Sequence, residues 1–293
     1  MTPLSSDLAA RRDRLVESIR GLGRCAVAYS GGVDSAVVAQ AAHLALGQGA
    51  VAVTAVSASL AAGELENARQ IAARIGIRHV ELSTHEFDNP GYVQNAPDRC
   101  YHCKTELYSQ LEQWCAPLEV DAILNGANFD DQGDYRPGMT AAREHRVKSP
   151  LLELGFRKED VRRLAEHWNL PVWDKPASPC LSSRVAYGEA VTPERLQRID
   201  QAEQYLRELG LRTVRVRYHR GDLARLEVPP EAFARLCEPE VREPLLARMK
   251  HLGFKYVTLD LAGFRSGSLN DALADRPAVV QIDLSQVAPQ SPD

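Results

Sequence analysis

The strongest indication of fold in this sequence is the stretch from Cys25 to Ser35, where an apolar run passes directly into a glycine-containing turn. Ala26–Tyr29 predicts a buried strand of a parallel sheet, and Ala36–Leu46 predicts an apolar helix. Two adjacent glycines between them let the backbone turn tightly and approach a ligand closely. The helix directs free N–H groups and the positive end of its dipole at this turn. The stretch therefore predicts an anion-binding loop.

The loop reads Ser30-Gly31-Gly32-Val33-Asp34-Ser35. A carboxylate in an anion site makes sense if it holds a divalent cation that bridges to phosphate. The loop has neither the Gly-Lys-Ser/Thr ending of a Walker loop nor a Gly-x-Gly-x-x-Gly pattern. It resembles the Ser-Gly-Gly-x-Asp-Ser signature of the PP-loop ATP pyrophosphatases, and the alternative is an ordinary glycine-rich turn. The resemblance implies that all six residues bind ATP through its pyrophosphate, that ATP is cleaved between the α and β phosphates, and that Asp34 holds Mg²⁺.

Length and composition allow two domains with substantial cores. The chain has 293 residues, of which 44% are hydrophobic and 25% are charged, as in an ordinary globular protein. Without a signal-peptide pattern or an apolar run of membrane-spanning length, a cytoplasmic protein with no membrane contact is expected. The net charge of −4 gives no general attraction to nucleic acid.

Strand and helix patterns alternate through the first half of the chain. Strands are expected at 26–29, 50–57, 79–83 and 121–126, and helices at 4–22, 36–46, 63–75, 99–114 and 157–168. This order predicts an α/β fold, a Rossmann-like parallel sheet with helices on both faces. Ser57 stands at the carboxyl end of the second strand, where ligands bind in such sheets, and the alternative is a cap for the helix that follows. Gly126 permits close approach of a base or ribose, and Asp131 is either a Mg²⁺ ligand or a solvated turn residue.

The spacing of the six cysteines is informative, since disulfides are not expected in a reducing compartment. Cys100 and Cys103 open a predicted helix, where two thiols three residues apart can ligate one metal centre. Redox pairs and structural cysteines have the same spacing. Cys180 lies in a stretch with prolines at 171, 176 and 179, which forbid a regular element. Nearby Lys175 and Arg184 would favour its thiolate. The remaining cysteines, Cys25, Cys115 and Cys237, are expected in the core.

The pattern changes from Thr192 onward, and a smaller α+β domain is expected. We assign residues 1–188 to the PP-loop domain, 189–284 to a substrate or oligomerisation domain, and 285–293 to a disordered tail. On the alternating strand at 213–218, Arg215 and Arg217 project to one side, and Arg265 joins them from a glycine-punctuated loop. Paired guanidinium groups suit a phosphate or a carboxylate. The alternative is a solvated face paired with acids such as Glu227.

Several motifs together resemble the LarE family over about residues 5–275. They are Gly-Ala-Asn-x-Asp-Asp from Gly126, Cys-Leu-Ser-Ser-Arg-x-x-Tyr-Gly from Cys180, Val-Arg-Val-Arg-Tyr-His from Val214 and Gly-Phe-Arg-Ser-Gly from Gly263. Members of this family are ATP-dependent sulfur transferases that help to build the nickel-pincer nucleotide cofactor of lactate racemase. The resemblance implies that a carboxylate of pyridinium-3,5-biscarboxylic acid mononucleotide is adenylated with release of pyrophosphate. A sulfur nucleophile then displaces AMP and leaves a thiocarboxylate.

The same resemblance implies roles for particular residues. The residues expected to take part in catalysis are Cys180, Asp34, Ser183 and Arg184, and those expected around the phosphate or carboxylate of the substrate are Arg215, Arg217, Arg265 and Glu227. In the best-known form of the family, one cysteine at the position of Cys180 gives up its own sulfur. Here Cys100 and Cys103 are present as well, as in a branch that resembles cluster-containing thiolases. Three thiolates can hold a [4Fe–4S] cluster and leave one iron open, although they also suit zinc.

Two rival functions differ in what they require. A PP-loop tRNA thiolase would need a broad basic face for RNA, against which the net charge of −4 counts. A non-enzymatic module that binds adenine nucleotides would need neither three loop cysteines nor paired arginines. The family resemblance also suggests a homo-oligomer such as a hexamer, and transient contact with other proteins of the cofactor pathway.

Overall fold

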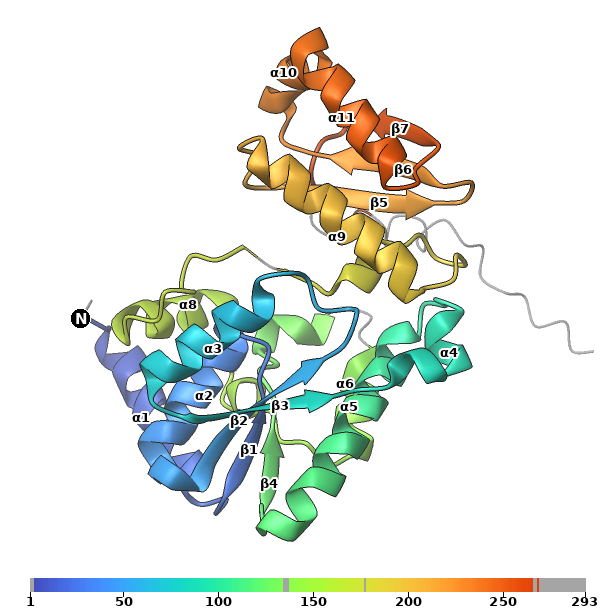
Figure 1. Ribbon diagram of the computed structural model, residues 1–293. Coiled ribbons are helices and arrows are strands. Elements are labelled where there is room, and N and C mark those ends of the chain that lie inside the picture. Colours follow the sequence, from blue (N-terminus) through green and yellow to red (C-terminus); the bar gives the residue numbers. More distant parts are fainter. Residues whose placement is uncertain (1–2, 134–136, 177, 266–267, 269–293) are drawn as a thin grey trace, which may run out of the picture.

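The computed structural model describes residues 3–133, 137–176, 178–265 and 268 (Figure 1). The predicted tail at 285–293 and the last part of the predicted C-terminal domain lie outside the described residues.

The N-terminal half contains a parallel sheet in the strand order β3-β2-β1-β4. Its strands are β1 (Cys25–Ala28), β2 (Ala50–Val56), β3 (Arg78–Ser83) and β4 (Ala122–Leu124). Val27 in the central strand pairs with Ala52 of β2 on one side and Leu124 of β4 on the other. The chain first builds outward from β1 and then returns to its other side, so the order of strands reverses between β1 and β4. In open α/β sheets ligands bind beyond the carboxyl ends of the strands at such a reversal.

Helices cover both faces of this sheet, which confirms the predicted fold class (Figure 1). The helices that share one hydrophobic cluster are α1 (Ser6–Arg20), α2 (Val33–Leu46), α3 (Glu64–Ile75) and α8 (Lys158–His167). The opposite cluster contains α5 (Arg99–Cys115) and α6 (Pro137–Glu144). The sequence of α2 is almost uniformly apolar because eight of its residues are buried between the sheet, α1 and α8.

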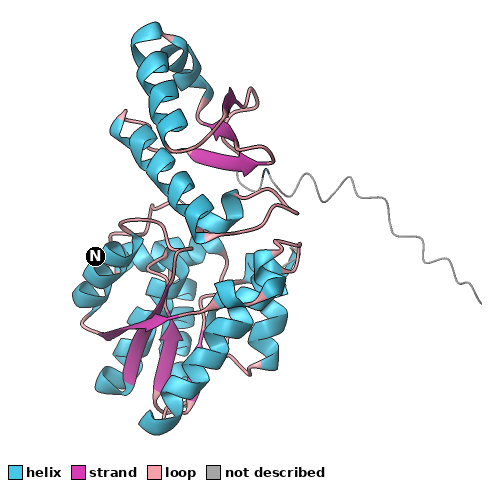
Figure 2. Ribbon diagram, turned by 45° about the vertical axis from the view of Figure 1, so that its right-hand side comes forward, coloured by secondary structure: helices cyan, strands magenta, loops and turns pink. Residues whose placement is uncertain are grey.

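A second sheet in the order β5-β6-β7 forms the C-terminal half (Figure 2). Its elements are α9 (Pro193–Glu208), β5 (Arg215–His219), β6 (Leu223–Glu227), α10 (Phe233–Cys237), α11 (Pro239–His251) and β7 (Tyr256–Leu259). β5 and β6 are antiparallel, whereas β7 joins β6 in parallel after the crossover through α10 and α11. The hydrophobic cluster of this half also takes in Leu181 and Val185. The domain boundary at residue 188 stays a prediction.

Two short helices lie outside the expected elements, and one expectation about burial is wrong. The segment before α5 contains α4 (Pro90–Val93), because the Asn89 side chain accepts the N–H of Gly91 and Pro90 occupies the first turn. Another short helix, α7 (Pro150–Glu153), precedes α8. The prediction of a buried Cys237 is wrong, since α10 has five residues and leaves this thiol exposed, whereas Cys25 and Cys115 are buried as expected.

None of the helices in the described ranges combines the length and the apolarity needed to cross a lipid bilayer.

Gly126, in the turn after β4, lies against Asp34 and Ser35 at the start of α2. A Cβ at this position would lie 2.7 Å from the backbone nitrogen of Ser35. Gly126→Ala should therefore lower the free energy of unfolding by about 1–3 kcal/mol, the usual cost of overpacking. It should also weaken ATP binding, because α2 must shift. Chemical denaturation and nucleotide titration measure the two effects.

Gly21→Ala is the matched control, since its added Cβ meets nothing closer than 3.6 Å and its φ of −70° suits alanine. Equal stability and equal ATP affinity of the two variants would show that the contact at Gly126 is not limiting.

Candidate active site

The loop after β1 has the shape of an anion cradle. Gly31 has a φ of 71°, in the left-handed region, and a Cβ there would come within 2.9 Å of the Ala68 side chain. The hydroxyl of Ser35 donates to the carbonyl of Gly32 (3.1 Å) and accepts the N–H of Ser30 (3.2 Å). These bonds close the turn on itself. The free N–H groups at the start of α2 therefore remain directed at the loop.

Both oxygens of Asp34 have protein partners. One accepts a hydrogen bond from the side-chain amide of Asn128 (3.1 Å), and the other forms an ion pair with Lys158. A carboxylate held by one amide and one movable ammonium group can exchange the ammonium for a metal ion. Sequence reasoning missed Asn128 and Lys158. Both residues are far from Asp34 in the sequence and reach it only because the chain folds back onto the PP-loop. From the sequence, Lys158 is recognisable only as part of the first turn of a predicted helix.

Two carboxylates within the turn after β4 stabilise it through hydrogen bonds to backbone N–H groups. Asp131 accepts the backbone N–H of Asn128 (2.9 Å), and Asp130 accepts the backbone N–H of Lys158 (2.8 Å). Asp130 also lies 3.6 Å from the guanidinium of Arg157. The carboxylates thus fix the turn that brings Asn128 to Asp34. A role of Asp131 in Mg²⁺ binding stays a prediction, as does the expected approach of a nucleotide to Gly126, which the structure packs against Asp34 and Ser35.

Ser57, beyond the end of β2, belongs to a buried polar group. Its hydroxyl and that of Ser59 both donate to the same oxygen of Glu86, with a distance of 3.1 Å from Ser59. Glu86 is 2% exposed, and its second oxygen has no hydrogen-bond partner among the described residues. Glu86 was not singled out from the sequence, because it falls in a stretch without periodicity.

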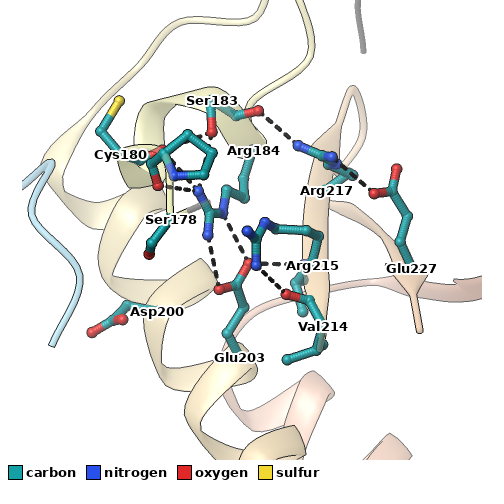
Figure 3. A network of polar contacts seen from close by, with 12 residues as sticks. Ser178, Cys180, Ser183, Arg184, Asp200, Glu203, Val214, Arg215, Arg217 and Glu227 are labelled. Atoms are coloured by element: carbon teal, nitrogen blue, oxygen red, sulfur yellow. Dashed lines mark hydrogen bonds and ion pairs between the residues drawn. The ribbon is translucent and has the colours of Figure 1, made fainter. Parts of the chain in front are cut away.

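Cys180 is exposed on a loop that a buried arginine supports from below (Figure 3). Arg184 is 1% exposed and forms an ion pair with Glu203 at 3.0 Å. Its remaining N–H groups donate to the carbonyls of Pro179 and Cys180 and to the hydroxyl of Ser183. In Figure 3 the thiol of Cys180 points away from this guanidinium. The structure therefore shows Arg184 as a support for the loop backbone.

The cations expected to favour the thiolate of Cys180 are engaged elsewhere. Lys175 pairs with Glu64 at 2.6 Å, and Arg184 pairs with Glu203. Electrostatic interaction with Cys180 contributes instead to a raised pKa of Arg99 and of Lys104, against the opposing effect of burial. That cations favour the thiolate of Cys180 stays a prediction.

The other two candidate cysteines differ from each other. Cys100 is exposed, whereas burial raises the pKa of Cys103 to about 12, with Lys104 acting in the opposite direction. The segments that carry the thiols meet through Arg99, which contacts the sulfur of Cys100 and the carbonyl of Ser182, two residues after Cys180. Within the described ranges, however, no three His, Cys, Asp or Glu side chains are already arranged to hold a metal ion.

Arg215 and Arg217 are buried, so the alternative of a solvated face is wrong, although its pairing with Glu227 holds for Arg217. Arg217 is 5% exposed and donates to the carbonyl of Ser183 (2.9 Å) and to Glu227 (2.8 Å). Its Nε has no hydrogen-bond partner among the described residues. Burial and repulsion from Arg184 lower the pKa of Arg215 to about 10. The cost of burying a guanidinium group falls when an anion lies beside it.

The predicted site residues form two groups that the Cys180 loop connects. The first group surrounds Asp34, and the second contains Ser183, Arg184, Arg215, Arg217 and Glu227. On one side the N–H of Leu181 donates to the carbonyl of Ser59 (2.9 Å). On the other side Ser183 accepts from Arg217. Arg265 is exposed on the loop after β7, and its expected place beside Arg215 and Arg217 stays a prediction.

Comparison with known proteins agrees with this architecture. Residues 12–112 match the family model described as asparagine synthase. An uncharacterised protein of Synechocystis is 47% identical over 91% of this chain and 99% of its own length. The pyridinium-3,5-bisthiocarboxylic acid mononucleotide synthase of Lactiplantibacillus plantarum is 40% identical, covering 91% of this chain and 96% of that protein. A tRNA-specific 2-thiouridylase of Rickettsia africae is 28% identical over 52% of each chain.

Proposed function

The chain belongs to the family of the pyridinium-3,5-bisthiocarboxylic acid mononucleotide synthase, the LarE family, and from this premise we propose that it inserts sulfur into a pyridinium mononucleotide at the expense of ATP. In this proposal the substrate is pyridinium-3,5-biscarboxylic acid mononucleotide. A carboxylate of it becomes a thiocarboxylate, and AMP and pyrophosphate are the other products. The reaction serves assembly of the nickel-pincer cofactor in the cytoplasm.

The observation that carries the proposal is the position of the Cys180 loop between the carboxyl edge of the parallel sheet and the buried arginines. Leu181 is bonded to Ser59 near the nucleotide edge of the sheet, and Ser183 is bonded to Arg217 beside the buried arginines. A thiol on this loop suits a reaction that joins ATP to a second, phosphate-bearing substrate. A module that only binds adenine nucleotides would need no such second site.

Activation of the carboxylate follows from the chemistry of the PP-loop. An oxygen of the carboxylate attacks the α phosphorus of ATP, a new O–P bond forms, and the bond to pyrophosphate breaks. Charge that accumulates on pyrophosphate would be stabilised by the N–H groups at the start of α2 and by the hydroxyl of Ser30, while Ser35 holds the turn closed. Asp34 would hold Mg²⁺ on the same phosphates, with Ser57, Gly126 and Asp131 proposed to line the nucleotide.

The phosphate of the mononucleotide is proposed to lie against Arg215 and Arg217. An anion there would offset the buried charge of Arg215, whose pKa is depressed to about 10, and would offer an acceptor to the Nε of Arg217, which has no partner among the described residues. Glu227 holds Arg217 in place, and Arg265 is proposed to close over the substrate from its loop. Anchoring the mononucleotide at this end would direct its carboxylates toward the Cys180 loop.

In the second half-reaction sulfur attacks the acyl carbon, a C–S bond forms, and the C–O bond to AMP breaks. We propose that Cys100, Cys103 and Cys180 together deliver this sulfur, which places the chain in the three-cysteine branch of the family. Their donor atoms suit a [4Fe–4S] cluster, and their shared neighbourhood beside Arg99 and Lys104 suits its negative charge. When bound, such a cluster would supply a sulfide from its open iron. Ser183 would help to fix the loop through its bond to the carbonyl of Cys180 (2.7 Å).

The alternatives differ in the fate of Cys180. With Cys180 as a sacrificial donor, its own sulfur would leave and dehydroalanine would remain. Zinc at the three thiols would organise them without supplying sulfur. A tRNA thiolase is disfavoured, because the thiouridylase relative matches only 52% of the chain and the net charge is −4. We further propose a homo-oligomer such as a hexamer, in transient contact with other proteins of the cofactor pathway.

The role of Asp34 is tested by Asp34→Asn. This variant should fold normally and lose pyrophosphate release at least 100-fold, because an amide is a poor ligand for Mg²⁺. The measurement is release of pyrophosphate from ATP in the presence of the mononucleotide, together with thermal unfolding. Asp13→Asn, at a carboxylate on α1 that is 67% exposed, is the control. Unchanged turnover of Asp34→Asn would overturn the metal role.

The source of sulfur is tested on protein purified without oxygen. The native chain should be brown and contain iron and acid-labile sulfide, and Cys100→Ala should lose both. Cys237→Ala removes an exposed thiol outside the site and should retain them. A colourless native chain without iron, whose mass falls by one H₂S after reaction, would instead establish Cys180 as the sacrificial donor.

A further inference from the structure

Arg99 is a buried cation immediately before Cys100, and no sequence motif singled it out. Its side chain is 6% exposed at the first residue of α5. Burial of a guanidinium is costly unless its N–H groups are satisfied and its charge is compensated. Its hydrogen bonds within the described residues go to Asn95, to the carbonyl of Ser182 (2.8 Å) and to the sulfur of Cys100 (4.0 Å). None of these partners is a carboxylate.

Two of these contacts join different segments of the chain. One N–H group of Arg99 donates to the carbonyl of Ser182 in the Cys180 loop. Another lies against the sulfur of Cys100 in the first turn of α5. Arg99 therefore occupies the junction between α5 and the Cys180 loop.

Asn95 extends this junction along the loop. It is fully buried, with a φ of 55°, and its amide donates to the carbonyls of Val185 (3.1 Å) and Ala186 (2.9 Å). The same side chain accepts a hydrogen bond from Arg99 through its oxygen. Arg99 and Asn95 thus donate to three backbone carbonyls of the returning chain, those of Ser182, Val185 and Ala186.

Tyr92 adds a second, independent tie. Its hydroxyl lies 2.6 Å from the hydroxyl of Ser182, and both residues are buried. Ser182 therefore receives one contact on its side chain and one on its carbonyl, two residues after Cys180. The exposed side chains of Cys100 and Cys180 have little packing of their own to hold them. Their separation is set instead by the backbone that Arg99 and Tyr92 hold.

We propose that Arg99 is a positioning residue that holds the Cys180 loop against the first turn of α5, which carries Cys100 and Cys103. In this arrangement the thiols act as one sulfur-delivery site. This inference rests on the proposed function only in the use made of the site, since the juxtaposition itself can be measured without substrate. Small displacements of a reacting group reduce rates strongly. The planar guanidinium of Arg99 holds its acceptors in a fixed geometry, and it would thereby fix the loop that carries the exposed thiol.

The first test measures the proximity of the thiols in metal-free, reduced protein. A short bifunctional reagent that bridges neighbouring thiols should link Cys180 to Cys100 or Cys103 in the native chain, as identified by mass spectrometry of the peptides. Arg99→Gln should be bridged at least fivefold more slowly. Arg99→Lys should recover part of the rate, because it retains the charge but lacks the fork. Arg163→Gln, at an arginine that is 59% exposed on α8, should behave as the native chain.

A second readout uses Co²⁺ alone as the probe. The native protein should give a thiolate-to-cobalt absorption band, and Arg99→Gln should need at least fivefold more Co²⁺ for the same absorbance. Folding is checked by circular dichroism and thermal unfolding. Native bridging rates and native cobalt affinity in a folded Arg99→Gln would overturn the inference. If that variant does not fold, Tyr92→Phe decides, with at least twofold slower bridging expected and an unchanged rate counting against the junction.

Assay of the two half-reactions separates this inference from the proposed function. Arg99→Gln should release pyrophosphate from ATP within twofold of the native rate but lose at least 90% of thiocarboxylate formation. A parallel loss of both products would overturn the assignment to sulfur delivery. Absence of ATP-dependent pyrophosphate release from the native chain would instead contradict the proposed function, and the bridging experiment would still decide the role of Arg99.

Discussion

The buried ion pair between Arg184 and Glu203 is the contact on which the arrangement of the site depends. The side chains are 1% and 0% exposed, so neither charge has access to water. Removing one partner of such a pair typically costs about 3–5 kcal/mol, since the other charge stays buried and uncompensated. Glu203 lies on α9, whereas Arg184 ends the Cys180 loop. The pair thereby fastens the loop to the C-terminal half, while the remaining N–H groups of Arg184 fix the carbonyls of Pro179 and Cys180.

Around this pair the molecule gathers more buried positive than negative charge. Arg184, Arg215 and Arg217 face Glu203 and Glu227, and burial together with repulsion from Arg184 depresses the pKa of Arg215. Arg99 is a further buried arginine at the other side of the loop, and its hydrogen bonds go to Asn95, Ser182 and Cys100 rather than to a carboxylate. Buried cations in excess of buried anions lower stability, and in the proposed function an anionic substrate would offset this cost. The anions in the proposed reaction are a nucleotide phosphate on one side and thiolate sulfur on the other.

Sequence reasoning identified the elements whose signals are local. The alternation of apolar strands and helices predicted the parallel sheet, and the PP-loop predicted the anion cradle, because each depends on neighbouring residues. Lys158, Glu86 and Arg99 were missed, because their importance appears only in contacts with distant residues, such as the pairing of Lys158 with Asp34 across 124 positions. The prediction that Cys237 is buried was wrong for a related reason. A helical pattern alone does not reveal that α10 has only five residues and leaves that side unburied.

The decisive experiment follows the oxygen of the substrate carboxylate. Mononucleotide labelled with ¹⁸O in its carboxylates is incubated with ATP and the oxygen-free native protein, and the AMP is analysed by mass spectrometry. If the carboxylate is adenylated and sulfur then displaces AMP, the oxygen that bonded to phosphorus stays there, and each AMP carries one ¹⁸O. Formation of thiocarboxylate with unlabelled AMP would show that sulfur enters without an acyl adenylate, and the proposed mechanism would be wrong.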